Sequence, residues 1–148
     1  MEQSKNHLAQ VAVKVIICNS KNEILLLKKQ EWDLALKTKN WDIPGGRIEM
    51  NETIADCLDR ELKEEIGLDI PGIASQTSFF TTAEILRTDF HLVFLVYLLH
   101  MDISDITLSK EHSSYIWKNI NEINEVADEQ SALGKVLCSQ ELNNALNS

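Results

Sequence analysis

Acidic side chains crowd one short stretch of this sequence in a pattern that a structural role does not explain. Residues 53–66 are predicted to form a helix that carries five acidic residues and one arginine. Carboxylates three or four positions apart on a helix repel one another, which weakens an isolated helix by a few tenths of a kcal/mol per pair. The cluster therefore calls for a cation, and hard oxygen ligands on a rigid element suit Mg²⁺ or Mn²⁺.

The expected helix has recognisable ends and two distinct sides. Asn51 is a good N-cap, and Gly67 suits the left-handed position that follows a helix. With about 100° between successive residues, one face is apolar and an acidic stripe follows its edge. The apolar face consists of Ile54, Ala55, Leu58, Leu62 and Ile66, and the stripe consists of Glu61, Glu64 and Glu65.

Residues 41–68 resemble the Nudix hydrolase family. Gly46, then Glu52, then the run Arg60-Glu61-Leu62-Lys63-Glu64-Glu65-Ile66-Gly67-Leu68 match the family's Nudix box at each defining position. The preceding segment 41–45, WDIPG, is also similar to the approach to that box. So many fixed positions make a specific signal. The alternative, a solvated acidic helix, explains neither the acids beside apolar positions nor the Pro-Gly-Gly segment.

The resemblance implies a reaction and a set of residues. Nudix hydrolases cleave a nucleoside diphosphate linked to another group X, by attack of water on a phosphorus of the pyrophosphate. Divalent metal neutralises the phosphate oxygens and activates the water. The implied metal ligands are Glu61, Glu64, Glu65 and the carbonyl of Gly45. Either Glu61 or a nearby acid is the expected base.

Further residues are candidates for orienting or binding roles. Arg60 is expected to hold one carboxylate in a fixed position, with a surface ion pair as the alternative. Glu52 is expected to be auxiliary. The resemblance implies that Glu111, before the last strand, supplies a further catalytic acid, although an exposed loop acid fits equally, and His112 has no assigned role.

Basic and aromatic side chains are candidates for substrate binding. Contacts with the substrate phosphates are proposed for Lys28, Lys29 and Arg47, and solvated side chains are the alternative. Stacking on a base is considered for the aromatic residues, which more often simply pack in a core; these are Trp32, Trp41, Phe79 and Phe80.

Length and charge narrow the class of protein. The 148 residues favour a single domain, residues 1–148, and the net charge of −9 disfavours nucleic acid polymers and anionic membranes as partners. Three scattered cysteines indicate neither a disulfide framework nor a zinc site. We expect a cytoplasmic protein, because the N-terminus lacks a signal-peptide core and the apolar run 92–99 is too short to span a bilayer. A monomer or a homodimer is expected.

The order of predicted elements indicates an α+β fold. A hairpin of strands 11–17 and 23–28 is followed by a loop at 31–40 that lines a pocket and an extended segment at 41–48. After the acidic helix come a turn at Pro71-Gly72, strands at 75–85 and 90–100, a strand at 115–117, and helices at 121–127 and 129–146. The resemblance implies an α/β/α sandwich around a mixed central sheet.

The class of substrate is only partly constrained. Between residues 69 and 96 there is no tyrosine and no proline apart from Pro71, which counts against ADP-ribose and dinucleoside polyphosphates by comparison with the family. Nucleoside triphosphates, damaged nucleotides and nucleotide sugars remain. The non-catalytic alternative is a Nudix-like sensor that binds nucleotides without turnover, and such a protein is expected to lose box acids that this chain retains.

Overall fold

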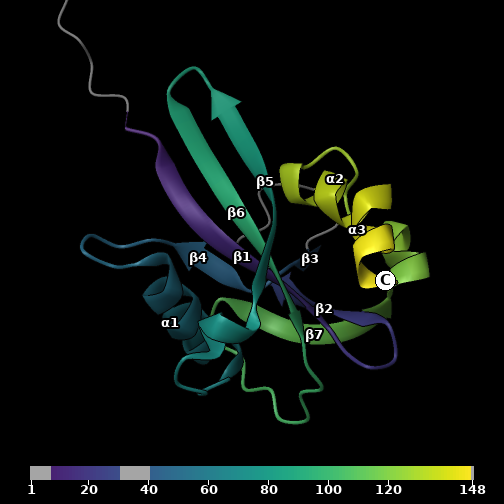
Figure 1. Cartoon of the computed structure of the whole chain (residues 1–148). Helices are drawn as coiled ribbons and strands as arrows, with labels where there is room; N and C mark the ends of the chain where they lie inside the picture. The colour runs from purple at the N-terminus through teal and green to yellow at the C-terminus, as the bar shows by residue number, and fades with distance from the viewer. Residues whose placement is uncertain (1–7, 31–40, 148) are drawn as a thin grey trace, which may run out of the picture.

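A mixed sheet forms the centre of the computed structural model, which describes residues 8–30 and 41–147 (Figure 1). The strand order is β3-β2-β1-β6-β5, with β4 paired to β1 and β7 paired to β2. β1 runs parallel to β6 and antiparallel to β2 and β4, so the expected mixed sheet is confirmed. The strands are β1 (Gln10–Cys18), β2 (Glu23–Lys29), β3 (Trp41–Asp42), β4 (Gly45–Arg47), β5 (Ser78–Arg87), β6 (Phe90–His100) and β7 (His112–Asn119).

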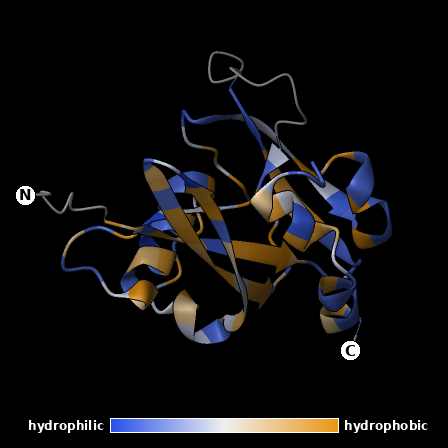
Figure 2. Ribbon diagram, turned by 90° about the horizontal axis from the view of Figure 1, so that it is seen from above, coloured by the Kyte–Doolittle hydropathy of each residue, from blue (hydrophilic) through white to orange (hydrophobic). Residues whose placement is uncertain are grey.

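The central strand β1 is buried on both of its faces. Side chains of a strand alternate between the two faces of the sheet, so a strand covered on both sides reads as a continuous apolar run. Ala12, Ile16 and Cys18 belong to one hydrophobic cluster, whereas Val13 and Val15 belong to the other. The predominantly hydrophobic colouring of the central strands in Figure 2 agrees with this two-sided burial.

Helices cover the two faces of the sheet and complete an α/β/α sandwich. The helix α1 (Ile54–Ile66) packs with the short 3-10 helix η2 (Ile73–Gln76) in the cluster around Val13 and Val15. On the opposite face lie η3 (Ile120–Glu125), α2 (Ala132–Leu137) and α3 (Gln140–Leu146). Figure 1 shows α1 and the C-terminal helices on opposite flanks of the sheet.

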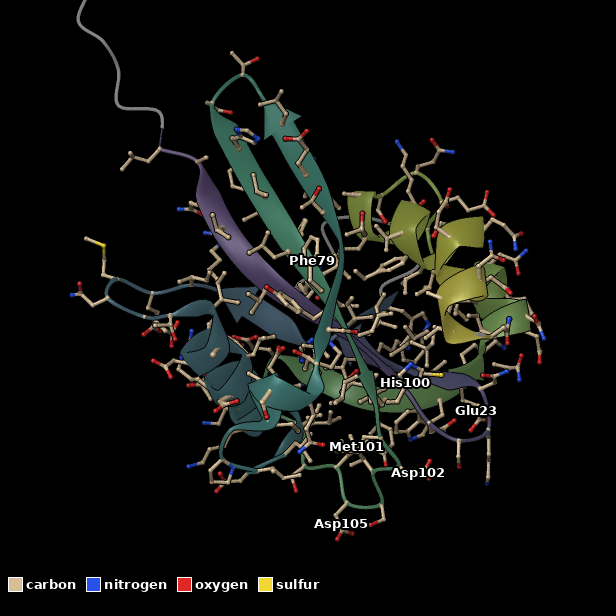
Figure 3. All side chains as sticks on the ribbon, viewed as in Figure 1. Glu23, Phe79, His100, Met101, Asp102 and Asp105 are labelled. Carbon is tan, nitrogen blue, oxygen red and sulfur yellow. The ribbon has the colours of Figure 1, made fainter. Side chains whose placement is uncertain are left out.

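Both predicted strand pairs are present. The turn between β1 and β2 is held by Asn19, whose side-chain oxygen accepts hydrogen bonds from the amides of Lys21 and Glu23. Asp102, which follows β6 and is labelled in Figure 3, accepts a hydrogen bond of 2.8 Å from the amide of Ser20. The second strand pair begins at Ser78 rather than at residue 75, because the preceding residues form η2.

The prediction of one long C-terminal helix was wrong. Residues 129–146 were expected to form a continuous helix, but the structure contains two short helices separated at Cys138 and Ser139. The hydroxyl of Ser139 accepts a hydrogen bond from the amide of Leu142 and thereby starts a new helix. Ser131 caps α2 in the same way, through the amide of Gly134.

The predicted loop at residues 31–40 lies outside the described residues. Among the described residues, no helix has the length and the apolar composition needed to cross a membrane.

Candidate metal-binding active site

Helix α1 begins and ends at residues that fix its position. Thr53 caps the helix by accepting a hydrogen bond of 3.0 Å from the amide of Asp56, so the prediction of Asn51 as the cap was wrong. Asn51 instead adopts a left-handed backbone with φ of 62°, in the turn before the helix. Gly67 takes the predicted left-handed conformation and donates to the carbonyl of Lys63.

The face of α1 that packs on the sheet differs in part from the expected one. Ile54 and Ala55 are exposed, because both lie in the first turn, ahead of the part of the helix that contacts the sheet. Cys57 and Glu65 join the buried face, together with the predicted Leu58, Leu62 and Ile66. One metal-ligand candidate is therefore buried beneath the helix, while Glu64 is exposed.

The two glycines that open the box hold the buried acids in place. Gly45 has φ of 142°, and its amide donates a hydrogen bond of 2.6 Å to Oε1 of Glu65. A Cβ atom at Gly45 would overlap the carbonyl of Val13, and one at Gly46 would overlap the carboxylate of Glu61. Glycine at position 45 therefore lets β4 approach the backbone of β1, and glycine at position 46 leaves room for the carboxylate of Glu61.

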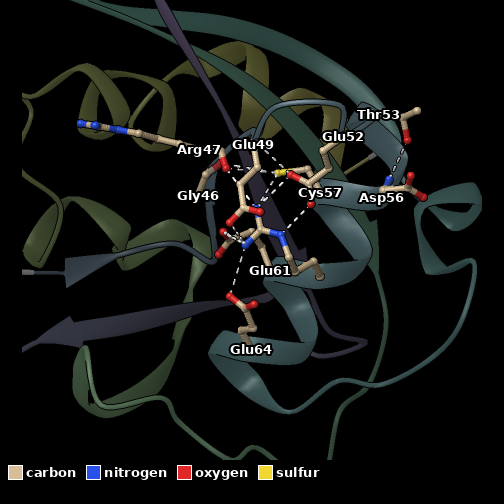
Figure 4. Close-up of polar contacts among 10 residues, drawn as sticks. Gly46, Arg47, Glu49, Glu52, Thr53, Asp56, Cys57, Glu61 and Glu64 are labelled. Atoms are coloured by element: carbon tan, nitrogen blue, oxygen red, sulfur yellow. Dashed lines mark hydrogen bonds and ion pairs between the residues drawn. The ribbon is translucent and has the colours of Figure 1, made fainter.

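Arg60 binds several carboxylates at once (Figure 4). Its Nε and Nη2 atoms donate to the two carboxylate oxygens of Glu52, at 2.6 and 3.0 Å. Nη1 donates to Glu61 at 2.9 Å and to Glu64 at 3.3 Å, and Nη2 also reaches the carbonyl of Arg47 at 3.1 Å. The planar guanidinium thus connects Glu52, just before α1, to Glu61 and Glu64, two of the acids that are expected to bind the metal.

The acids differ in their electrostatics. The hydrogen bond from Arg60 lowers the pKa of Glu52 to about 2. Burial raises the pKa of Glu61, although Arg60 opposes this shift. Burial also raises the pKa of Glu65 to about 8, against the opposing charge of Lys14 and the hydrogen bond from Gly45. At Glu61 and Glu65, burial therefore outweighs the nearby positive charges of Arg60 and Lys14.

A buried ion pair lies beside these acids, on the pocket side of the sheet. Nζ of Lys14 is 3.1 Å from Oδ2 of Asp42 and donates to the carbonyl of Ile43 at 3.2 Å. Burial lowers the pKa of the lysine, but Asp42 and Glu65 outweigh it and the pKa is raised. Lys14 therefore stays charged and ties β1 to the chain just ahead of Gly45.

The start of β7 brings two further groups to Glu65. The ligand atoms of Glu65, Glu111 and His112 all lie within 4.8 Å of one another. Glu111 is exposed, whereas His112 is buried, and burial lowers the pKa of its imidazole. The loop before β7 is held by the amide of Ser109, which donates to the carbonyl of Glu65 at 3.3 Å.

These residues fit a divalent metal ion. Two carboxylates whose pKa values burial raises, and an imidazole nitrogen that has no hydrogen-bond partner in the part of the chain that the structure describes, form a donor set typical of hard and borderline cations. Lys14 and Arg60 compensate part of the negative charge at its edges.

The basic candidates are distributed around a neighbouring pocket of about 950 Å³. Lys29 and Arg47 line it, whereas Lys28 does not, and Arg47 stacks over the ring of Phe90 at 5.8 Å. Of the aromatic candidates, Trp41 and Phe80 line the pocket.

Two aromatic candidates are not placed at the pocket. Phe79, labelled in Figure 3, is 55% exposed and packs edge-on against the ring of Tyr97, and it is not among the residues that line the pocket. Trp32 lies outside the described residues.

Sequence reasoning missed Lys14 and Asp42. A single lysine inside the apolar run VAVKVIIC was the available signal, because a charge is rarely buried on a central strand without a partner. Its partner was not foreseeable, since the pairing joins residues 28 positions apart. The hydrogen bonds from Arg60 to Glu52 and from Gly45 to Glu65 likewise form only in the folded protein, so the sequence did not predict them.

Curated proteins with similar sequences match part of this chain. An RNA pyrophosphohydrolase of Ruthia magnifica subsp. Calyptogena magnifica is 37% identical over 90 residues, which cover 61% of this chain and 44% of that protein. An 8-oxo-dGTP diphosphatase of Proteus vulgaris is 36% identical over 73 residues, or 47% of this chain and 57% of that protein. The chain spans about half the length of these relatives.

Structure and family comparisons cover almost all of the chain. The crystal structure of a MutT protein from Methanosarcina mazei Go1 superposes with a TM-score of 0.75 at 23% identity, over 95% of this chain and 99% of that one, which shows a shared fold. The model of the NUDIX domain matches residues 8–139. This chain therefore belongs to the NUDIX domain family.

Proposed function

We propose that this protein is a divalent-metal-dependent pyrophosphohydrolase that uses water to cleave the pyrophosphate bond of a nucleoside diphosphate linked to X. The observation that carries the proposal is the arrangement of the box acids. Glu61 and Glu65 lie against Gly45 and Gly46 of β4, and Arg60 and the amide of Gly45 fix their carboxylates. An acidic helix with a purely structural role has no need of this crowding.

Each residue of the proposed site has a chemical task. The metal ligands are Glu61, Glu64, Glu65 and the carbonyl of Gly45. Bound Mg²⁺ or Mn²⁺ supplies charge neutralisation at the pyrophosphate and activates water. Arg60 orients Glu61 and Glu64, while Glu61 and Glu111 are the candidate bases for the proton of the attacking water.

The neighbouring pocket supports a nucleotide as the substrate. Its volume of about 950 Å³ suits a nucleotide-sized ligand. Lys29 and Arg47 in its lining supply positive charge for phosphates, and Trp41 and Phe80 supply flat apolar surface for a base.

Nucleoside triphosphates and damaged nucleotides are the first substrates to test, and nucleotide sugars follow. The similarity to a protein named 8-oxo-dGTP diphosphatase supports this order. The net charge of −9 supports small-molecule substrates over nucleic acid polymers. We further propose a cytoplasmic monomer or homodimer.

A screen of nucleotides with Mg²⁺ or Mn²⁺, with detection of phosphate and pyrophosphate, tests the proposal. We expect turnover of at least one nucleotide, its loss in EDTA and its return with added metal. The sensor alternative predicts saturable nucleotide binding without any product, and that result would replace the hydrolase proposal.

A further inference from the structure

The buried imidazole of His112 has no assigned task in the reaction described above. Only 4% of its side chain is exposed, and Nδ1 has no hydrogen-bond partner among the described residues. The nearest acid atom recorded for Nδ1 is Oε2 of Glu65, at 3.7 Å, too far for a hydrogen bond. Buried polar atoms are nearly always satisfied in folded proteins, so this nitrogen requires an explanation.

The fold directs His112 toward Glu65 through an irregularity in the sheet. β7 pairs with β2 such that Ser114 opposes Lys28 and His112 opposes Lys29, which leaves one extra residue in β7. Such a bulge changes the direction in which neighbouring side chains point. The amide of His112 also donates to the carbonyl of Ser109, which anchors the start of the strand.

The partners of Glu65 leave one of its oxygens for another ligand. Its Oε1 accepts the hydrogen bond from Gly45, whereas Oε2 is the atom nearest to Nδ1 of His112. Two ligand atoms that each lie about 2.1 Å from one ion are separated by roughly 3 to 4 Å. The separation of 3.7 Å between Nδ1 and Oε2 falls in this range.

We propose that Nδ1 of His112, Oε2 of Glu65 and a carboxylate oxygen of Glu111 form a mixed nitrogen and oxygen position for a divalent metal ion. One ligand atom from each of the three residues lies within 4.8 Å of the others, so a small movement of the exposed Glu111 closes the set. The position deepens the proposed function, because it shares Glu65 with the proposed metal ligands of the box.

The chemistry of the ligands sets the metal preference. Mg²⁺ favours oxygen ligands and keeps much of its water, whereas imidazole suits first-row transition ions. The position therefore binds Mn²⁺ more tightly than Mg²⁺, and His112 is the source of the difference. An all-carboxylate site lacks this source of discrimination.

Pulsed electron paramagnetic resonance of Mn²⁺ bound to the full chain tests the proposal directly. An imidazole nitrogen bound to Mn²⁺ produces nitrogen modulation, which changes when the histidines are labelled with the heavier nitrogen isotope. We expect this modulation in the wild-type protein and its loss in His112→Gln. A wild-type signal without modulation from a histidine nitrogen would overturn the proposal. This test uses only the wild-type protein, so it does not depend on whether the variant folds.

Isothermal titration with Mn²⁺ and with Mg²⁺ gives an independent readout. In His112→Gln we expect the preference for Mn²⁺ over Mg²⁺ to fall by about tenfold or more, with Mg²⁺ affinity nearly unchanged. His100→Gln, at an exposed position at the end of β6, is the matched control and is expected to keep the wild-type ratio. An unchanged ratio in His112→Gln contradicts the proposal.

Failure of this inference differs from failure of the proposed function. Hydrolysis with Mg²⁺, together with a Mn²⁺ signal that lacks histidine nitrogen, removes only the role of His112. Nitrogen modulation without hydrolysis of any nucleotide keeps the metal position and rejects the hydrolase.

Discussion

Burial and charge oppose each other at Glu65. Only 5% of it is exposed, its carboxylate accepts one hydrogen bond from Gly45, and burial raises its pKa to about 8. The folded protein therefore favours the protonated acid at neutral pH unless a cation is bound. A metal ion relieves this cost, since it stabilises the ionised form.

The stability of the metal-free protein should depend on pH through Glu65. Its pKa is raised from 4.5 to about 8 on folding, so the folded state holds the proton more tightly than the unfolded chain does. The free energy of unfolding that this carboxyl contributes at low pH is thus lost as the pH rises from about 4.5 to about 8. In EDTA, the melting temperature of the wild type should fall from about pH 5 to about pH 8 more steeply than that of Glu65→Gln.

Glu64→Gln, at an exposed position of the same helix, is the matched control for this comparison and should follow the wild type. The depressed pKa of Glu52 acts below pH 4.5 and does not overlap the window. Parallel melting curves for wild type and Glu65→Gln would show that burial does not perturb this carboxyl.

Arg60 should contribute to both stability and turnover. Its removal leaves the half-buried carboxylates of Glu52 and Glu61 without their shared cation, at a cost of about 1–3 kcal/mol. Turnover should also fall about tenfold or more in Arg60→Ala, because Glu61 loses its orientation. Urea unfolding and steady-state kinetics measure the two effects.

Arg60→Lys keeps the charge but loses the planar fork that binds both oxygens of Glu52, so it should recover only part of the lost stability. If Arg60→Ala leaves both stability and kinetics unchanged, the arginine forms only a surface ion pair.

At the scale of elements, the site depends on how α1 packs against Gly45 and Gly46 of β4. Thr53 starts the helix and Gly67 ends it, and between them the acids on one side meet the two glycines. The acids belong to a helix and the glycines to a strand, so their geometry depends on both the helix ends and the backbone of β4.

Mutation can distinguish the observed cap residue, Thr53, from the predicted one, Asn51. Thr53→Ala removes the hydroxyl that accepts from Asp56 and should lower the free energy of unfolding by about 1 kcal/mol. Asn51→Gly should cost little, because glycine readily adopts the left-handed backbone found there. Equal costs for the two variants in urea unfolding would restore Asn51 as the cap.

Gly46 should matter through the acid that it faces. In Gly46→Ala the new methyl group overlaps the carboxylate of Glu61, so metal affinity should fall about tenfold or more. In a Glu61→Ala background the same change should have little further effect. Titration of both pairs with Mn²⁺ gives the coupling, and additive losses would show that Gly46 acts independently of Glu61.

The elements that were predictable from the sequence are those with local signals. The alternating and continuous apolar runs predicted the strands, and Gly67 predicted the end of α1. The break at Ser139 was missed, because a serine inside a helical pattern caps a new helix only when the surrounding chain bends there. The Lys14–Asp42 pair was missed because it depends on strand pairing between distant residues.

At the scale of the whole molecule, the sandwich places the acids of α1 next to an open pocket. The acids lie against the α1 face of the sheet, and Lys29, Arg47 and Trp41 line the pocket beside them. Binding of metal to the folded protein alone should stabilise it by mass action. The melting temperature should therefore rise as Mg²⁺ or Mn²⁺ is added to the millimolar range, and a flat curve would count against the metal site.

The most direct measurement of the central claim is the turnover of a nucleotide substrate by wild type and Glu65→Gln, with Mg²⁺ and with EDTA. The change keeps the size of the side chain but removes the charge that a hard cation needs. Wild-type turnover should vanish in EDTA and return with Mg²⁺, and Glu65→Gln should remain folded and lose about 10²-fold or more of kcat/KM. Undiminished wild-type turnover in EDTA, or near-normal turnover by a folded Glu65→Gln, would contradict a metal-dependent mechanism at this helix.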